Sequence, residues 1–242
     1  PSWLAIRPKW QAYAAIPFYQ AVDNIEVYRP ANLVIPGVMP SFWSNEIASY
    51  MVRPLIRKLH SKNQFDAIVS FDLSEGGGVA WRVGHDLGLP AAGWATGSDI
   101  RSDPESPHGR RVAQTLRNLD LVLYQSRELL AIGARLLKVS PEELQQSGRH
   151  HVLPQGVILP NPSSKHSGRT QVRTALSITD EEVMILYVGR IVHDKGIFGL
   201  IDVLAKNSDR IKRWKLVFLG SNRAFDQTED FEAHVHRFPE LC

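Results

Sequence analysis

A glycine and two cations follow one apolar segment of the sequence, and their types and spacing suit phosphate binding. Residues 183–188 predict a buried strand, and Gly189 and Arg190 come directly after it. Lys195 follows just before an amphipathic helix expected from residue 196. Glycine lets backbone approach a ligand closely, arginine offers a planar fork of donors, and lysine offers a point charge. Because a helix N-terminus adds unpaired N–H groups, this segment can clamp a phosphate or diphosphate.

The same three residues also fit a second interpretation, a glycine turn with two solvated surface cations. Taken alone, a Gly-Arg pair and a lysine favour this second interpretation, because such residues are common on protein surfaces. The choice between the two therefore depends on the rest of the chain.

Two further loops follow predicted strands and are candidate cleft contacts. The first loop contains Gly76 and Gly77, which either approach an acceptor or a phosphate or form a plain turn. The second loop, which follows the strand expected over 91–95, contributes Thr96, Gly97, Ser98 and Asp99. Asp99 either contacts sugar hydroxyls or acts as a turn aspartate, and the pattern favours the turn.

Histidine pairs raise the question of a metal site. His150-His151 and His234-x-His236 are the closest pairs, but the sequence places no third ligand beside either. We therefore expect surface histidines and no metal site. The single cysteine, Cys242, excludes an intrachain disulfide framework and a cysteine-based zinc cluster. The sequence also contains no Gly-x-Ser-x-Gly elbow, P-loop or Gly-x-Gly-x-x-Gly fingerprint.

The elements that must position these residues form an α/β pattern from residue 65 onward. Strands are expected over 67–71, 91–95, 121–124, 151–154, 183–188 and 214–219, with helices over 44–60, from about 78 to 87, and over 109–118, 126–137, 170–176 and from 196. The first 43 residues predict irregular structure with one or two strands, and Pro54 is expected to kink or split the first helix. Alternating strands and helices predict a parallel sheet with helices on both faces.

Length and composition are those of a globular protein with one large domain or two small ones. The chain has 242 residues, of which 43% are hydrophobic and 22% charged, and a formal net charge of +3. This charge is too small to indicate a nucleic-acid partner. No apolar run approaches the roughly 20 residues of a membrane-spanning helix, and we expect a cytoplasmic location. We expect domains over 1–157 and 170–242, joined by a Pro- and Ser-rich linker over 158–169.

Four segments in register resemble family-4 glycosyltransferases, which have two Rossmann-like domains in the GT-B arrangement. The strand, Gly189-Arg190, the short loop, Lys195-Gly196 and the following helix resemble the start of that family's second domain. Three upstream segments resemble family segments in the family's order: 65–69, 120–126 and 152–157. In the last of these, Gln155 stands where the family usually has asparagine. The resemblance covers about residues 60–220.

The resemblance implies a retaining glycosyltransferase (EC 2.4) in which Arg190 and Lys195 hold the diphosphate of a nucleotide-sugar donor, with Gly189 beside them. The implied acceptor is a glycan, a lipid-linked glycan or a small molecule, in cell-surface polysaccharide or glycoconjugate synthesis. No metal or other cofactor is then expected, because the two cations replace a metal. The basic segment 53–62 is either a solvated helix face, which is favoured, or a peripheral contact with the inner face of the membrane.

The sequence also departs from the family's pattern. Thr96 stands where family members often have a histidine, so no catalytic histidine is carried over. Glu232 and Glu240 have the spacing of the family's acidic pair but come too early in the domain, and we reject that match. The true pair and the N-terminal glycine-rich loop are absent, so the chain looks cut at both ends, with an incomplete second domain and no activity expected alone. The alternatives are a non-catalytic two-lobed sugar or phosphate-binding protein and a degenerate glycosyltransferase homologue.

Overall fold

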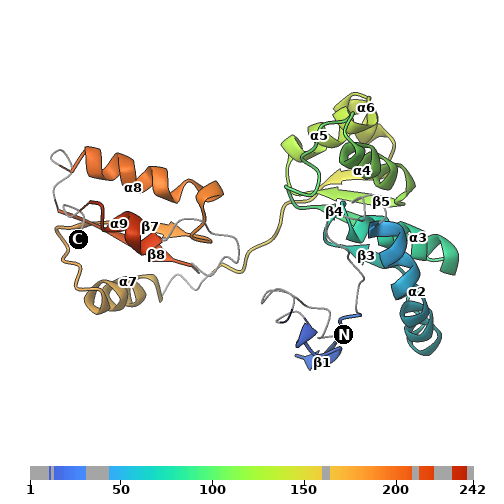
Figure 1. The fold of residues 1–242 in the computed structure, drawn as a ribbon, viewed down its shortest axis with the longest axis horizontal. Coiled ribbons are helices and arrows are strands. Elements are labelled where there is room, and N and C mark those ends of the chain that lie inside the picture. The colour runs from blue at the N-terminus through green and yellow to red at the C-terminus, as the bar shows by residue number, and fades with distance from the viewer. Residues whose placement is uncertain are drawn as a thin grey trace. The chain divides into compact units, whose positions relative to one another are not determined.

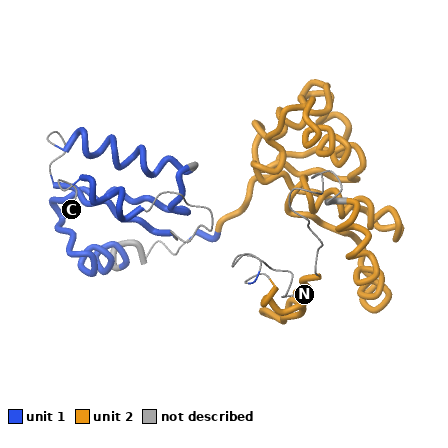
Figure 2. Tube along the Cα trace, viewed as in Figure 1, with its two compact units in different colours: residues 1–11, 158–242 blue, residues 12–157 orange. Residues whose placement is uncertain are grey.

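The protein has an α/β structure that divides into two compact units. The structure, a computed structural model, describes residues 11, 14–30, 44–159, 164–208, 213–220 and 231–238. One unit comprises residues 12–157, and the other comprises residues 158–242 with residues 1–11 (Figures 1 and 2). We call them the N-terminal and the C-terminal unit. Both contain parallel strands, as the sequence pattern predicts.

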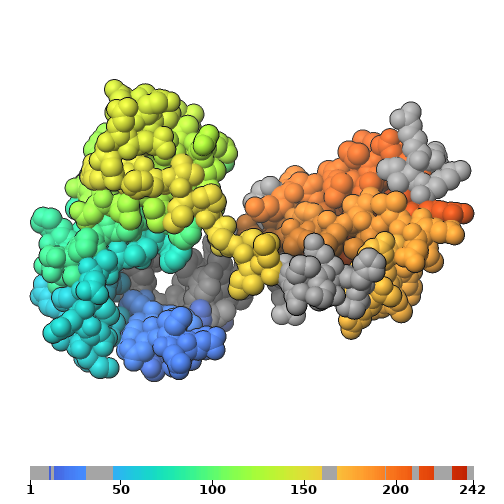
Figure 3. Space-filling model, turned by 180° about the vertical axis from the view of Figure 1, so that it is seen from behind, coloured from blue at the N-terminus to red at the C-terminus, as the bar shows by residue number. Residues whose placement is uncertain are grey.

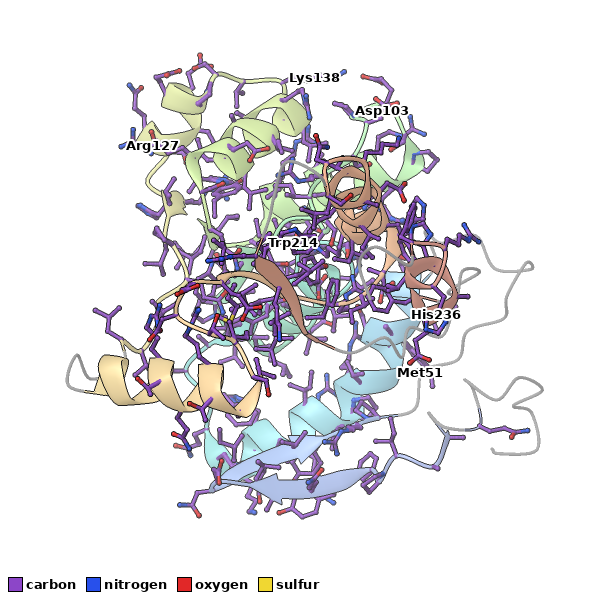
Figure 4. All side chains as sticks on the ribbon, turned by 90° about the vertical axis from the view of Figure 1, so that its left-hand side faces the viewer. Met51, Asp103, Arg127, Lys138, Trp214 and His236 are labelled. Atoms are coloured by element: carbon purple, nitrogen blue, oxygen red, sulfur yellow. The ribbon has the colours of Figure 1, made fainter. Side chains whose placement is uncertain are left out.

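The N-terminal unit is built on a four-stranded parallel sheet with the order β3-β4-β5-β6. Its strands are β3 (Ile68–Ser70), β4 (Ala91–Ala95), β5 (Leu121–Tyr124) and β6 (His150–Val152). The helices that connect and flank them are α2 (Ser44–Asn63), α3 (Gly76–Leu87), α4 (Pro107–Asn118), α5 (Arg127–Leu137) and α6 (Pro141–Gln146). Figure 4 labels the two ends of α5, Arg127 and its C-cap Lys138.

The connecting helices all cover one face of this sheet. The strands follow each other in chain order, and right-handed crossovers between consecutive parallel strands put every connection on the same side. The buried side chains agree: Ala91 and Ala95 of β4 and Val122 and Tyr124 of β5 are buried, whereas the alternate residues are half-buried. The core therefore lies between this face and α3, α4 and α5. The prediction of helices on both faces is wrong for the described residues, because no crossover reverses direction along the sheet.

Helix α2 is continuous across Pro54, so the predicted split is wrong, while the predicted kink stays a prediction. The helix packs along α3, and two ion pairs join the helices through residues of α2 that precede the proline. Glu46 pairs with Arg82 and Arg53 with Asp86.

Two local structures complete the N-terminal unit. Residues before α2 form a hairpin of β1 (Tyr19–Val22) and β2 (Ile25–Tyr28), which fits the prediction of one or two strands there. Helix α6 is not predicted. Its signal is Ser140 followed by Pro141 and Glu143, because Ser140 and Glu143 form a reciprocal capping box around a proline in the first turn.

The C-terminal unit has a two-stranded parallel sheet of β7 (Val183–Val188) and β8 (Trp214–Leu219). Its helices are α7 (Ser164–Ala175), α8 (Ile197–Lys206) and α9 (Phe231–Val235), and a 3-10 turn, η3, covers His193–Lys195. Helix α7 starts at Ser164, earlier than the expected residue 170, so the second half of the predicted linker is helical. The apolar side chains of α8 and of both strands meet in a separate small core.

The segment between β6 and α7 carries no helix or strand in its described part. Val157, Ile158 and Leu159 are strongly exposed there, and the segment is drawn in yellow in Figure 3. Among the residues that the structure describes, no helix has the length and apolarity needed to cross a membrane.

Candidate functional site

The loop after β7 is shaped by two glycines at the carboxyl edge of the C-terminal sheet. Gly189 has a φ of +151°, a conformation that residues with a side chain rarely adopt, and its N–H donates to the carbonyl of Leu219 at 3.0 Å. A Cβ on Gly220, at the end of β8, would lie 1.8 Å from the carbonyl oxygen of Gly189. Glycine is therefore required after β8 because the two backbones approach each other closely, and after β7 because of the positive φ.

The backbone of Arg190 is fixed, whereas its side chain is exposed. The Tyr187 hydroxyl donates to the Arg190 carbonyl at 2.8 Å, and the N–H of Val192 donates to the same oxygen at 3.0 Å. Ile191 and Val192 are both buried and anchor the loop to the core. Sequence analysis did not single out the Tyr187 hydroxyl, although its spacing three residues before Arg190 fits a turn of this kind.

Lys195 lies at the start of α8, whose first turn has no side-chain cap. Gly196 is the N-cap residue in the left-handed conformation, with a φ of 72°. The first backbone hydrogen bond there runs from the N–H of Leu200 to the carbonyl of Gly196 at 3.0 Å. His193 precedes Lys195 and stacks on Phe198, with ring centroids 5.4 Å apart. The uncapped N–H groups and Lys195 both place positive potential at this end of the helix.

Arg190 and Lys195 therefore lie on one short loop, and both side chains are exposed. Among the described residues, neither side chain has a hydrogen-bond or ion-pair partner. Two unpaired cations beside an uncapped helix N-terminus, at the carboxyl end of a parallel strand, are suited to binding a diphosphate. The structure thus brings together Gly189, Arg190 and Lys195, while their role in donor binding stays a prediction.

Asp99, in the N-terminal unit, has a different environment. It is 7% exposed, and its carboxylate accepts hydrogen bonds from backbone N–H groups on two loops. The donors are Leu73 at 3.0 Å, Thr96 at 3.0 Å and Gly97 at 2.7 Å. The Thr96 hydroxyl adds a fourth bond at 3.2 Å. Asp99 is therefore the turn aspartate of the favoured interpretation and ties the loop after β3 to the loop after β4, whereas Thr96 and Ser98 remain exposed at the carboxyl edge.

Gly76 and Gly77 are packed into the first turn of α3. The carboxylate of Asp72 accepts from the N–H of Glu75 at 2.8 Å and from the N–H of Gly76 at 3.1 Å. A Cβ on Gly76 would lie 2.5 Å from Asp72 Oδ2, and one on Gly77 would lie 2.9 Å from the Thr115 methyl group. This geometry gives both glycines a packing role, and a contact with an acceptor stays a prediction. Asp72 was missed because it lies four residues before the first helical residue, Gly76, and not at the N-cap position where capping side chains are sought.

The histidine pairs do not form a metal cluster in the described part of the chain. His150 is buried and its Nδ1 lies 2.9 Å from the Tyr124 hydroxyl, whereas His151 is exposed. Burial, with smaller effects of Arg149 and His151, lowers the pKa of His150 to about 4. Burial raises the pKa of the Tyr124 hydroxyl well above its usual value. His234 is buried in α9 and bonds Asp202 at 3.0 Å; Figure 4 labels His236, beyond this helix.

Several residues of the sequence analysis fall outside the described residues or outside a site. Glu240 and Cys242 lie outside the described residues. Glu232 lies in the short helix α9, directly after an undescribed segment.

A comparison with known families found a match within the C-terminal unit. The family model for "Glycosyl transferases group 1" matches residues 168–236, which include α8, both strands and the loop with Arg190 and Lys195. Residues 168–236 are therefore similar to the group 1 glycosyl transferases, in agreement with the resemblance stated above.

A curated relative and two solved structures extend the comparison. The relative is the "Putative teichuronic acid biosynthesis glycosyltransferase TuaC" of Bacillus subtilis (strain 168), 26% identical over 214 residues. That match covers 86% of this chain and 50% of the relative, so the chain spans about half the length of the relative.

The two solved structures are distant. A UDP-N-acetylglucosamine 2-epimerase from Rickettsia bellii has a TM-score of 0.46 at 11% identity, covering 80% of this chain and 49% of that one. A UGT transferase from Siraitia grosvenorii in complex with UDP has a TM-score of 0.44 at 16% identity, covering 88% and 58%.

Proposed function

We propose that this chain is the donor-binding and acceptor-binding part of a nucleotide-sugar-dependent glycosyltransferase with a GT-B arrangement. The observation that carries the proposal is the pair of cations Arg190 and Lys195 between β7 and α8, whose side chains have no partner within the described part of the chain. The family match over 168–236 supports it, because that match contains this loop. The similarity to a putative teichuronic acid biosynthesis glycosyltransferase supports a role in polysaccharide synthesis.

In the proposed mechanism, the loop stabilises charge on the leaving group. As the bond between the sugar and the diphosphate breaks, negative charge develops on the departing nucleotide. Arg190 donates two hydrogen bonds to one phosphate and Lys195 neutralises the other, while the first N–H groups of α8 face the same charge. Two cations then do the work of a metal ion, and sugar transfer proceeds with retention at the anomeric carbon.

The N-terminal unit binds the acceptor in this proposal, and the protein works in the cytoplasm near the inner face of the membrane. Helix α2 presents exposed Arg57, Lys58 and Lys62, which suit an anionic surface. Arg53 is not free for such a contact because it pairs with Asp86.

Turnover tests the proposal. The Arg190→Ala and Lys195→Ala variants of the protein should each lower kcat by at least about 100-fold, since each removes transition-state stabilisation. Release of nucleotide from a panel of sugar nucleotides is the readout, and thermal unfolding checks the fold. Near-normal rates in both variants would contradict the proposal that Arg190 and Lys195 hold the donor diphosphate. Because no activity is expected from this chain alone, both variants are made in the full-length protein. Nucleotide-sugar binding without turnover in that protein favours the non-catalytic binding protein or the degenerate homologue.

A further inference from the structure

The side chain of Tyr187 connects strand β7 to the loop that carries the two cations. Its hydroxyl donates to the carbonyl oxygen of Arg190, three residues further along the chain, at 2.8 Å. The half-buried ring packs against the small apolar core of the C-terminal unit, and a phenylalanine ring could do the same. The hydroxyl is therefore the part of this side chain that needs a separate explanation.

The ring of Tyr187 is held by aromatic neighbours in the same unit. Tyr187 pairs with Phe218 in the register of the sheet, and the centroids of their rings lie 6.1 Å apart. Phe218 in turn packs edge-on against Phe231 of α9, with ring centroids 4.9 Å apart. Because a tyrosine side chain has only two torsions to restrain, these contacts give its hydroxyl a defined place at the end of β7.

The same hydroxyl lies close to the backbone of Gly189. A Cβ on Gly189 would lie 3.3 Å from the Tyr187 hydroxyl oxygen, which is closer than most Cβ contacts. The absence of a side chain at Gly189 therefore leaves room for the hydroxyl, in addition to allowing the positive φ at this residue.

The carbonyl of Arg190 accepts two hydrogen bonds, which restrain the backbone on both sides of it. The second donor is the N–H of Val192, at 3.0 Å. Because a peptide group is planar, two donors on one carbonyl oxygen fix the orientation of the peptide that follows Arg190. They thereby also restrain the direction in which the exposed Arg190 side chain leaves the backbone.

A restrained backbone at this point favours the binding of a phosphate group. An arginine that donates two parallel hydrogen bonds to a phosphate must hold its planar guanidinium in one orientation, and its long side chain loses rotamer freedom in doing so. A backbone that is already oriented adds nothing further to this cost, which is the general benefit of preorganisation. A loop that is only partly in the binding conformation binds more weakly, in proportion to the populated fraction.

We propose that Tyr187 is a positioning residue of the donor site, because its hydroxyl holds the Arg190 backbone in the orientation from which the guanidinium meets the donor diphosphate. This inference rests on the proposed function, since it takes Arg190 to bind the diphosphate. Tyr187 itself makes no contact with the ligand in this proposal. Its effect passes through Arg190 and not through Lys195, whose own N–H donates to the Val192 carbonyl at 3.1 Å further along the loop.

The test is a double-mutant cycle in the full-length protein, read out by equilibrium titration with UDP, GDP and ADP. Tyr187→Phe removes the hydroxyl and keeps the ring, and it should raise the Kd of the bound nucleotide about three- to tenfold, as expected for one lost hydrogen bond. In an Arg190→Ala background the same change should alter the Kd by less than about twofold, because the group that the hydroxyl positions is gone. In a Lys195→Ala background the full effect should remain.

Two controls accompany the cycle. Thermal unfolding checks the fold of Tyr187→Phe, which should be retained because the Val192 N–H still donates to the Arg190 carbonyl. The matched variant is Tyr28→Phe, which also removes a hydroxyl with one side-chain hydrogen bond, to Glu26 at 3.2 Å in the N-terminal unit. It should leave the Kd unchanged.

Two results would overturn the inference and leave the proposed function intact. In the first, Arg190→Ala weakens nucleotide binding whereas Tyr187→Phe binds like the unaltered protein. In the second, Tyr187→Phe weakens binding equally with and without the Arg190 guanidinium, so the hydroxyl acts by another route. If no nucleotide binds the unaltered protein, or if Arg190→Ala has no effect, the proposed donor site and this inference both fail.

Discussion

At the scale of single residues, the partners of a charged group decide its role. Asp99 and Arg190 both follow a parallel strand at the edge where ligands bind. The Asp99 carboxylate accepts three backbone N–H groups, so it is a structural group, whereas the Arg190 side chain has no partner among the described residues. A sequence shows the position of such residues, but their partners come from loops that are distant along the chain.

The buried pair of His150 and Tyr124 predicts how stability depends on pH. Burial lowers the pKa of folded His150 to about 4, while the unfolded chain takes up this proton near pH 6.5. Between these values the unfolded state binds more protons, so stability is complete above pH 6.5 and falls as the pH drops toward 4. The loss attributable to His150 should be about 3 kcal/mol.

Chemical unfolding at several pH values measures this loss. The His150→Gln variant can keep a hydrogen bond to Tyr124 but cannot titrate, so its stability should change less between pH 6.5 and 4. His85→Gln, at an exposed histidine of α3, is the control and should keep the pH dependence of the unaltered chain. Equal slopes for the unaltered chain and His150→Gln would refute the prediction.

At the scale of elements, the strands could be predicted closely and some helix boundaries could not. β4, β5, β7 and β8 agree with the apolar runs residue for residue, because strands of a parallel sheet are continuous, mostly apolar segments. Helix α2 passes through Pro54 although proline disfavours a helix interior, so the local rule did not predict this element. The short helix α6 depends on a capping box rather than on periodicity, so it was missed.

Substitution of a glycine in α3 tests whether close packing around the first turn of this helix requires a residue without a side chain. Gly77→Ala should lower the free energy of unfolding by about 1–3 kcal/mol, because the new methyl group would meet Thr115 and the Asp72 carbonyl. Gly199→Ala in α8 is the matched control. It has open space around it and should raise stability by about 0.5–1 kcal/mol.

Thermal or chemical unfolding of the two variants provides the measurement. A Gly77→Ala variant as stable as the unaltered chain would show that the first turn of α3 has room for a side chain. The loop with Gly76 and Gly77 would then again be a candidate for ligand contact.

At the scale of the whole molecule, the loops at the carboxyl ends of the parallel strands in each unit carry groups that could bind a ligand. In the C-terminal unit the loop carries Arg190 and Lys195, and the family match covers it. The sequence was sufficient to find these residues, because strand, glycine and cations are adjacent along the chain. It was not sufficient to find the hydrogen bond from the Tyr187 hydroxyl to the Arg190 carbonyl, because that contact forms only when the chain turns after β7.

The most direct test of the central claim is equilibrium titration of the full chain with UDP, GDP and ADP. The account predicts that at least one nucleotide binds and that Arg190→Ala and Lys195→Ala each raise its Kd at least about tenfold. Lys206→Ala, which removes a cation from the other end of α8, should leave the Kd unchanged. Binding of none of the three nucleotides, or equal affinity in all the variants, would contradict the claim that this loop holds a donor diphosphate.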